Sequence, residues 1–236
     1  IYLRAVFEKT TYTLSFESNT GITLDAQYYQ FNDSVSLPLI PDVTGYTYVG
    51  MFEDASYTVP FSIQTMPGED IHVYLYYEIN TYTVTFNDSD GTVLSSQDID
   101  YLSDAVAPTE PSKTGYTFTG WDEVFTAVTG NLIVTATYTI NTYTVTFEDE
   151  DGSILSTQDI DYLSDATAPV EPSKTGYTFE GWDQLFKEVS GNLTVTATYT
   201  INTYTVTFND SDGTVLSTQD IDYLSDAVAP TEPSKT

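Results

Sequence analysis

Apolar and polar residues alternate along most of the chain in short runs with a period of two. Tyr82, Val84 and Phe86 occupy one parity of residues 81–86, and threonines occupy the other. Successive side chains of a strand point to opposite faces, and β-branched and aromatic residues favour strands. The pattern therefore predicts a half-buried strand here and, by the same alternation, a closing strand over 132–139.

Turn residues between these runs predict how the strands connect. Asp-Gly at 90–91 lies between two alternating segments, which is a hairpin signal because glycine accepts the positive φ of the turn. The return strand is expected at about 92–102. Prolines and a glycine within 108–115 indicate an extended crossing, after which another strand begins at Tyr116.

Two short segments carry a helical signal. Ser103-Asp104-Ala105 has the composition of a helix cap, and Pro108 would stop the helix after one turn. Helical spacing also relates four apolar residues: Trp121, Val124, Phe125 and Val128. Their β-branched content leaves an irregular strand as the alternative. Each unit is therefore expected to be mainly β with minor α.

The whole pattern repeats. The string Ile-Asn-Thr-Tyr-Thr-Val-Thr-Phe begins at Ile79, Ile140 and Ile201, so the period is 61 residues. Two complete copies differ at 14 of these 61 positions. Near-identity at a fixed period is typical of a tandem array, in which each copy is one small structural unit.

The copies predict five segments. These are the end of a preceding repeat at 1–9, a divergent repeat at 10–78, complete repeats at 79–139 and 140–200, and a truncated repeat at 201–236. Tyr12 lies 70 residues before Tyr82, so the divergent repeat contains an insertion of about nine residues. Because both ends fall inside a repeat and no initiator Met is present, we expect a fragment of a longer array. Linkers of a few residues predict a semi-rigid rod.

Composition excludes several classes of function. The chain has 6 Lys and Arg residues against 35 Asp and Glu residues, and its net charge is −29. No cationic track is available to neutralise phosphates, so nucleic-acid binding is not expected. The absence of cysteine excludes disulfides, thiolate nucleophiles and cysteine-ligated metals. No apolar run approaches the roughly 18 residues of a membrane span, so this segment is not expected to insert.

A longer string resembles a known family. Gly-Tyr-Thr-Phe-x-Gly-Trp occurs at 115–121 and 176–182, after an Asp-Gly hairpin and a Pro-rich crossing and before a Thr-Ala-x-Tyr strand. This order resembles the Listeria–Bacteroides repeat, the internalin B-type B repeat of bacterial surface proteins. The resemblance implies small β-grasp-like repeats in an elongated, extracellular protein that is secreted or attached to the cell wall. It brings no catalytic residues and no cofactor.

The acidic hairpins are the sharpest candidate sites. Carboxylates precede each hairpin glycine at Asp88, Asp90, Asp149, Asp151, Asp210 and Asp212. An Asp-x-Asp-Gly run can wrap a calcium ion, which takes six to eight oxygen ligands. The downstream bidentate Glu of a calcium loop is not at the required distance, so a solvated turn is favoured. The family usually has Asn-Gly-Gly here, so a ligand of another member need not transfer.

Other chemical candidates have structural explanations. Carboxylate pairs recur in every unit without a predicted cleft, and we interpret them as surface charge: Asp98 and Asp100, Asp159 and Asp161, Asp220 and Asp222. Trp121 and Trp182 could stack on sugars, but their neighbours favour a place in the core. His72 is expected on the polar face of a strand. Three lysines in Pro-Ser-Lys-Thr are expected to be exposed and not crosslinked: Lys113, Lys174 and Lys235.

The sequence therefore predicts a protein that is not an enzyme and needs no cofactor. The first hypothesis is an extracellular stalk or spacer that displays other domains. The alternative is an adhesive module that binds a host protein or glycan through many weak contacts. The divergent repeat at 10–78 is the expected specialised site in that case, and a calcium-stiffened rod is a variant of the first hypothesis.

Overall fold

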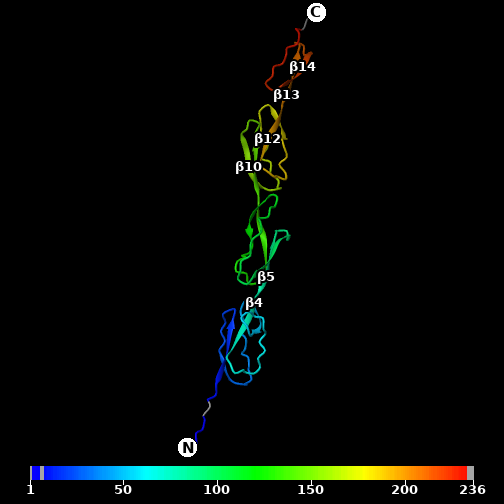
Figure 1. Ribbon diagram of the computed structural model, residues 1–236. Coiled ribbons are helices and arrows are strands. Elements are labelled where there is room, and N and C mark those ends of the chain that lie inside the picture. The colour runs from blue at the N-terminus through cyan, green and yellow to red at the C-terminus, as the bar shows by residue number, and fades with distance from the viewer. Residues whose placement is uncertain (1, 6–7, 233–236) are drawn as a thin grey trace. The chain divides into compact units, whose positions relative to one another are not determined.

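Strands connected by long loops make up the described part of the chain (Figure 1). The computed structural model describes residues 2–5 and 8–232. Two compact units divide the chain, one of residues 1–111 and 120–137 and the other of residues 112–119 and 138–236. Each is described below by its own sheets and contacts.

The first sheet contains four strands in the order β2-β1-β4-β3. Its members are β1 (Thr11–Ser18), β2 (Gln27–Gln30), β3 (Tyr46–Phe52) and β4 (Ile71–Ile79). The central strands β1 and β4 run parallel, and both outer strands are antiparallel to their neighbours. The core on this sheet contains Leu14, Met66, Ile71 and Val73.

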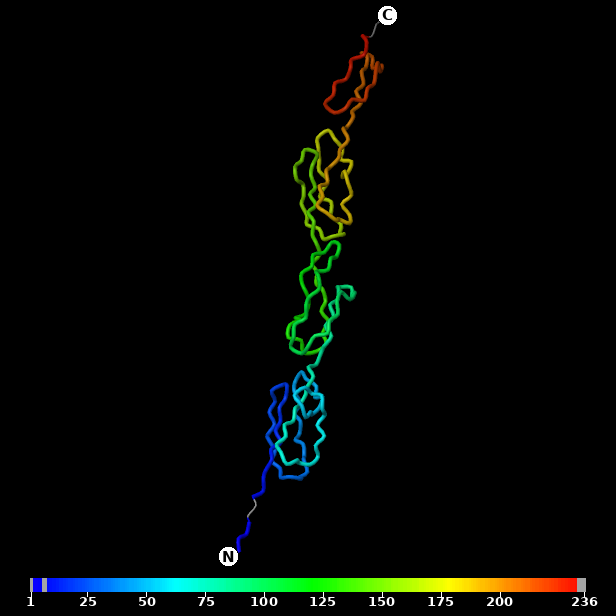
Figure 2. The backbone as a smooth tube through the Cα atoms, in the orientation of Figure 1, coloured from blue at the N-terminus to red at the C-terminus, as the bar shows by residue number. Residues whose placement is uncertain are grey.

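The same strand order recurs twice. One sheet has the order β6-β5-β8-β7, with β5 (Thr81–Asn87), β6 (Val93–Asp100), β7 (Tyr116–Trp121) and β8 (Leu132–Ile140). The next has the order β10-β9-β12-β11, with β9 (Thr142–Glu148), β10 (Ile154–Asp161), β11 (Tyr177–Trp182) and β12 (Leu193–Ile201). A final hairpin pairs β13 (Thr203–Asn209) with β14 (Val215–Asp222). Figure 2 follows the backbone through these hairpins and the loops between them.

The alternation of side chains explains the strands. Val84 and Phe86 are fully buried in β5, whereas Thr81 and Thr83 on the other face are exposed. The predicted hairpin and return strand are confirmed, since β5 pairs antiparallel with β6. Gly91 at the turn has a φ of 89°, a conformation that glycine adopts without steric cost.

The cores are small and aromatic. Val145, Phe147, Ala166, Val189 and Val195 form the buried cluster on β9 and β12. Trp182 lies edge-on to Phe147 with ring centroids 5.0 Å apart, and Trp121 lies 5.1 Å from Phe86 in the same way. Both tryptophans therefore pack against the core, as the sequence suggested.

The expected minor α content is wrong for the described residues, in which strands are the only extended regular elements. The two segments with helical signals are loops that bond to each other. Ala105 N–H donates to the Phe125 carbonyl at 2.9 Å, and Val128 N–H donates to the Ser103 carbonyl at 2.9 Å. These partners satisfy backbone groups that a helix would have satisfied internally. Tertiary packing of Val128 and Phe125 on the core outweighs the weak helical spacing.

The β-grasp-like expectation is not supported, because no helix crosses a sheet within residues 2–5 and 8–232. An extended, proline-containing segment makes each crossing instead. Within these ranges no helix is long and apolar enough to span a bilayer. The broader prediction of small, mainly β repeats in tandem is confirmed.

Candidate functional site

The hairpin carboxylates bind the backbone of their own turns. Asp151 Oδ1 accepts the N–H of Ser153 at 2.9 Å and its hydroxyl at 2.6 Å. These bonds lower the pKa of Asp151, the hydroxyl having the larger effect. Asp212 Oδ1 accepts the N–H of Thr214 at 2.9 Å, which lowers the pKa of Asp212. Both carboxylates thus favour the charged form, because the donors of their own turns stabilise the negative charge.

The first carboxylate of each hairpin accepts the next backbone N–H. The distances are 2.6 Å for Asp88, 2.8 Å for Asp149 and 2.6 Å for Asp210. Asp90 Oδ1 accepts the N–H of Thr92 at 2.9 Å. Within the described ranges, no group of three or more His, Asp or Glu side chains is placed to hold a metal ion. Calcium binding by these six carboxylates therefore stays the alternative to the solvated turn that the sequence favours.

The hairpin that contains Asp149 and Glu150 is also tied to a lysine. Lys174 Nζ donates to Glu150 Oε2 at 2.5 Å and lies 4.1 Å from the centroid of the Tyr177 ring. Tyr199 donates its hydroxyl to Asp149 at 2.7 Å. Burial and this carboxylate together raise the pKa of Tyr199 to about 12. Lys174 is therefore half-buried and not fully exposed as predicted, because the acidic turn and the tyrosine rings hold it.

The other carboxylate candidates and His72 lie on strand surfaces. Asp98, Asp159 and Asp220 each accept a threonine hydroxyl from the neighbouring strand, at 2.9, 3.0 and 2.8 Å. His72 is exposed, as predicted, and its Nε2 lies 3.1 Å from Glu17 Oε2. Lys113 is exposed, and Lys235 lies outside the described residues. These carboxylates support strand pairing and do not converge on a reacting centre.

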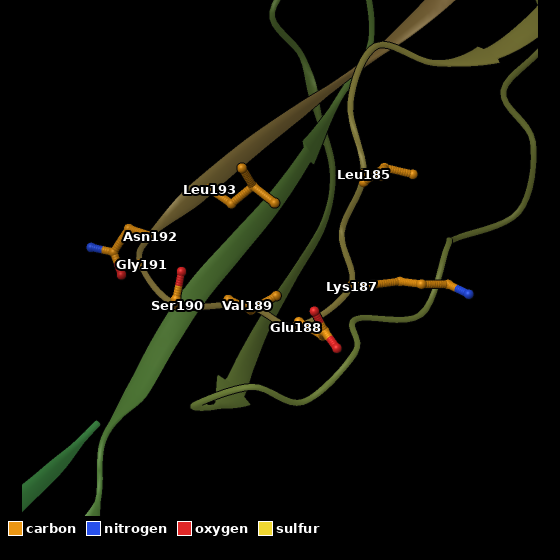
Figure 3. A pocket seen from close by; sticks show the side chains of 8 residues that line it. All are labelled: Leu185, Lys187, Glu188, Val189, Ser190, Gly191, Asn192 and Leu193. Carbon is orange, nitrogen blue, oxygen red and sulfur yellow. The ribbon is translucent and has the colours of Figure 1, made fainter. Parts of the chain in front are cut away.

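A shallow hollow follows the loop before β12. Its volume is about 310 Å³, and it is lined by Leu185 and residues 187–193. Figure 3 shows that Lys187 and Asn192 point in opposite directions from this loop. Because its polar side chains diverge, the hollow does not assemble an acid, a base or a nucleophile around one point.

The most regular set of hydrogen bonds joins consecutive repeats. The carbonyl of Gly176 accepts the N–H of Asn202 at 2.8 Å, and the carbonyl of Asn202 accepts the N–H of Tyr223 at 2.8 Å. Thr178 donates its hydroxyl to Asn202 Oδ1 at 2.6 Å. A single asparagine thus connects a glycine turn of one repeat to the tyrosine after the second strand of the next. We call this arrangement the junction.

The junction occurs three times in the described residues. The other two sets are Gly115, Thr117, Asn141 and Tyr162, and Gly45, Thr47, Asn80 and Tyr101. The threonine hydroxyl bonds are 2.7 and 2.6 Å long. Each set lies within one of the two compact units. The contact is therefore a property of the repeat and not of one position in the chain.

A tyrosine ring covers the glycine in every junction. A Cβ added at Gly115 would lie 1.9 Å from Cδ1 of Tyr162. The corresponding distances are 1.8 Å at Gly45 and 1.9 Å at Gly176. The φ of each of these glycines is 77° or 78°. Only glycine fits here, because both the backbone conformation and the ring above it exclude a side chain.

Sequence reasoning missed the junction. The pattern places Gly115 in the extended crossing and Tyr162 at the end of a return strand. It does not predict a contact between the two. The repeated Gly-Tyr-Thr and Asp-Tyr-Leu-Ser strings were visible. Nothing in their spacing says that they meet across a repeat boundary.

The comparison with protein families gives matches along most of the chain. The family model described as the Listeria-Bacteroides repeat domain matches residues 12–74, 82–140, 143–202 and 204–236. These ranges contain all the junction residues except Asn80 and Asn141, which lie in the short gaps between matches.

Two relatives illustrate the range of similarity. A protein of Evansella cellulosilytica, provisionally named a Gly-rich membrane protein, is 32% identical over 256 residues, which cover 100% of this chain and 30% of that protein. Internalin H of Listeria monocytogenes is 39% identical over 117 residues, which cover 40% of this chain and 21% of that protein. The chain thus spans a third or less of the length of either relative.

Among solved structures, domains 3–4 of the Streptococcal High Identity Repeats in Tandem from a cell surface protein are similar to this chain. The sequence identity is 18% and the TM-score is 0.28, with 56% of this chain and 98% of that chain covered.

Proposed function

The chain belongs to the Listeria-Bacteroides repeat domain family, and from that premise we propose that it is part of an extracellular stalk or spacer that displays other domains of a bacterial surface protein. The observation that carries this proposal is the junction. A spacer must hold its length. An asparagine that bonds to the glycine turn of one repeat and to the tyrosine of the next restricts how the two repeats rotate against each other. The family is one of repeat domains and not of enzymes.

The proposal takes the repeat boundaries predicted from the sequence. The units are 10–78, 79–139, 140–200 and 201–236, with residues 1–9 as the end of a preceding repeat. Near-identical units add length without adding a distinct recognition surface at each step. The net charge of −29 supports the same role, because like-charged arrays repel one another on a crowded surface.

Small-angle X-ray scattering of the full chain tests the spacer. We expect an elongated profile whose maximum dimension is the same at low salt and in about 1 M salt, where the Debye length falls to about 3 Å. Junctions would hold the length under both conditions. A profile that contracts strongly in salt would show that charge repulsion holds the repeats apart. A compact profile under both conditions would show that nothing does.

Adhesion is the second candidate, and one observation in the divergent repeat favours it. A hollow of about 390 Å³ is lined by Ser34, Val35, Leu37 and residues 61–64. Leu39 nearby is 92% exposed, and exposed apolar groups at a hollow are typical of recognition surfaces. The complete repeats offer no equivalent insertion.

Binding of the full chain to a panel of host matrix proteins and glycans tests adhesion. Saturable binding that is lost in the Leu37→Ser, Leu39→Ser double variant would establish this surface as the adhesive one. A Val124→Ser, Leu185→Ser variant, altered at exposed apolar residues of the complete repeats, is the matched control. Absence of saturable binding across the panel leaves the spacer alone.

A further inference from the structure

A fourth aromatic ring has the position of the junction tyrosines but no glycine turn upon it. In the first sheet Thr11 pairs with Gln30, as Thr81 pairs with Asp100 in the second. The residue after Gln30 is Phe31, which therefore corresponds to Tyr101. Phe31 is 62% exposed, whereas Tyr101 and its two equivalents are half-buried.

The surroundings of Phe31 also match a junction. By the same register, Tyr12 corresponds to Tyr82, which lies 6.5 Å from the ring of Tyr101. Thr10 takes the place of Asn80. Its backbone N–H therefore corresponds to the Asn80 N–H, which donates to the Gly45 carbonyl. Lys9, Thr10, Tyr12, Gln30 and Phe31 line a hollow of about 360 Å³. The face is thus concave where the other junctions are filled.

We propose that this surface, which we call the Phe31 face and define as Thr10, Tyr12 and Phe31, binds the Lys-Thr-Gly-Tyr turn of a further repeat of this family placed directly ahead of Thr10. This inference rests on the proposed function, because it extends the same junction by one step. The occupant is defined by chemistry. It must present a glycine with positive φ, since any Cβ there would meet the aromatic ring, as it would at the three filled junctions.

The divergent repeat does not fill the face itself. Gly68 is the glycine of this repeat near Phe31, and an added Cβ there would lie 3.7 Å from Phe31 Cδ2. That distance is an ordinary van der Waals contact, and Gly68 lacks the positive φ of the junction glycines. Gly68 therefore borders the face and does not occupy it.

Trypsin cleavage provides the test, because the turn that docks carries its own lysine. Lys113 lies two residues before Gly115, and the full chain contains only 6 Lys and Arg residues. A second copy of residues 79–139 is joined ahead of Lys9 in place of residues 1–8, so that its last strand runs into β1 as β8 runs into β9. Mass spectrometry then measures cleavage at Lys113 and at its copy in the added repeat.

We expect the copied lysine to be cleaved as slowly as Lys113. The Phe31→Ala variant should accelerate cleavage at the copy about tenfold, the scale of one lost aromatic contact, and leave Lys113 unchanged. The Phe31→Tyr variant should retain the protection. Circular dichroism of the Phe31→Ala variant checks that the repeat remains folded. We expect it to fold, because the Phe31 side chain is largely exposed.

Two other outcomes are decisive. If the copied lysine is cleaved rapidly with or without Phe31 while Lys113 is protected, the Phe31 face does not dock a glycine turn, and the spacer proposal stands. If Tyr162→Ala fails to accelerate cleavage at Lys113 in the unextended chain, the filled junctions do not restrain their repeats. The spacer proposal then fails together with its extension.

Discussion

Glycines with positive φ fall into two groups that differ in what lies above them. Gly91, Gly152 and Gly213 form hairpins, and a Cβ added to any of them would meet nothing within 4 Å. The junction glycines have the same backbone requirement and a tyrosine ring in addition. The sequence identifies the first group as hairpin turns and places Gly115 in the extended crossing. It does not reveal the ring above Gly115, because that ring comes from the next repeat.

This difference predicts unequal costs for the same substitution. Gly152→Ala should cost about 1–2 kcal/mol, from left-handed strain alone. Gly115→Ala should cost a further 1–3 kcal/mol or so, because its Cβ overlaps the Tyr162 ring. Chemical denaturation of both variants measures the difference. Equal losses would show that the ring moves aside freely.

The lowered pKa of Asp151 makes its hairpin sensitive to acid. A carboxyl whose pKa is lower in the folded state adds stability above its usual pKa of 3.8 and loses it as the pH falls through the folded value. The Asp151→Asn variant should therefore melt below the parent protein at pH 7. The gap should close as the pH falls below 3.8. A gap that persists in acid would assign the effect to shape and not to charge.

At the scale of elements, the alternation of side chains predicted most strands but not the loops. Strands β5 and β8 follow from period two, and the Asp-Gly turn explains β6. Helical spacing at Trp121–Val128 misled, because Phe125 and Val128 reach the core from a loop bonded to residues 102–105, whereas Val124 is exposed. Local pattern determines a strand, whereas this loop depends on a partner segment about twenty residues away in the sequence.

A glutamine fastens the crossing to its neighbouring strand in the repeats that begin at Ile79, Ile140 and Ile201. Gln158 donates to the Thr167 carbonyl at 2.6 Å and accepts the Thr167 N–H at 3.0 Å; Gln97 and Gln219 hold Val106 and Val228 in the same way. Gln158→Ala should reduce the free energy of unfolding by about 1–3 kcal/mol, since two bonds are lost. Val170→Ala, at a residue 91% exposed, should change it little. Denaturant melts that coincide for both variants would contradict this role.

The hairpins predict indifference to calcium. Their carboxylates accept bonds from their own turns, so we expect the same Tm with calcium as with EDTA. Differential scanning calorimetry of the full chain makes the comparison. A fall of several degrees in EDTA would instead establish a calcium site, and Asp210→Asn and Asp149→Asn would then locate it.

At the scale of the whole molecule, the junction is one local contact that recurs three times in the described residues. An array in which each repeat touches only its neighbours gains stability and stiffness from its interfaces. The repeat period predicted small β units in tandem, and the described residues contain three four-stranded sheets with the same strand order. The junction required the structure, because it pairs residues across a repeat boundary.

Double electron–electron resonance between two spin labels, one on each side of a junction, tests the central claim most directly. The chain has no cysteine, so Thr109→Cys and Val170→Cys place two spin labels at equivalent, exposed positions of consecutive repeats. We predict one narrow distance distribution that Tyr162→Ala broadens and Gly152→Ala leaves unchanged. A distribution that is broad in the parent chain, or that ignores the loss of Tyr162, would contradict the account of the junction as the element that fixes one repeat against the next.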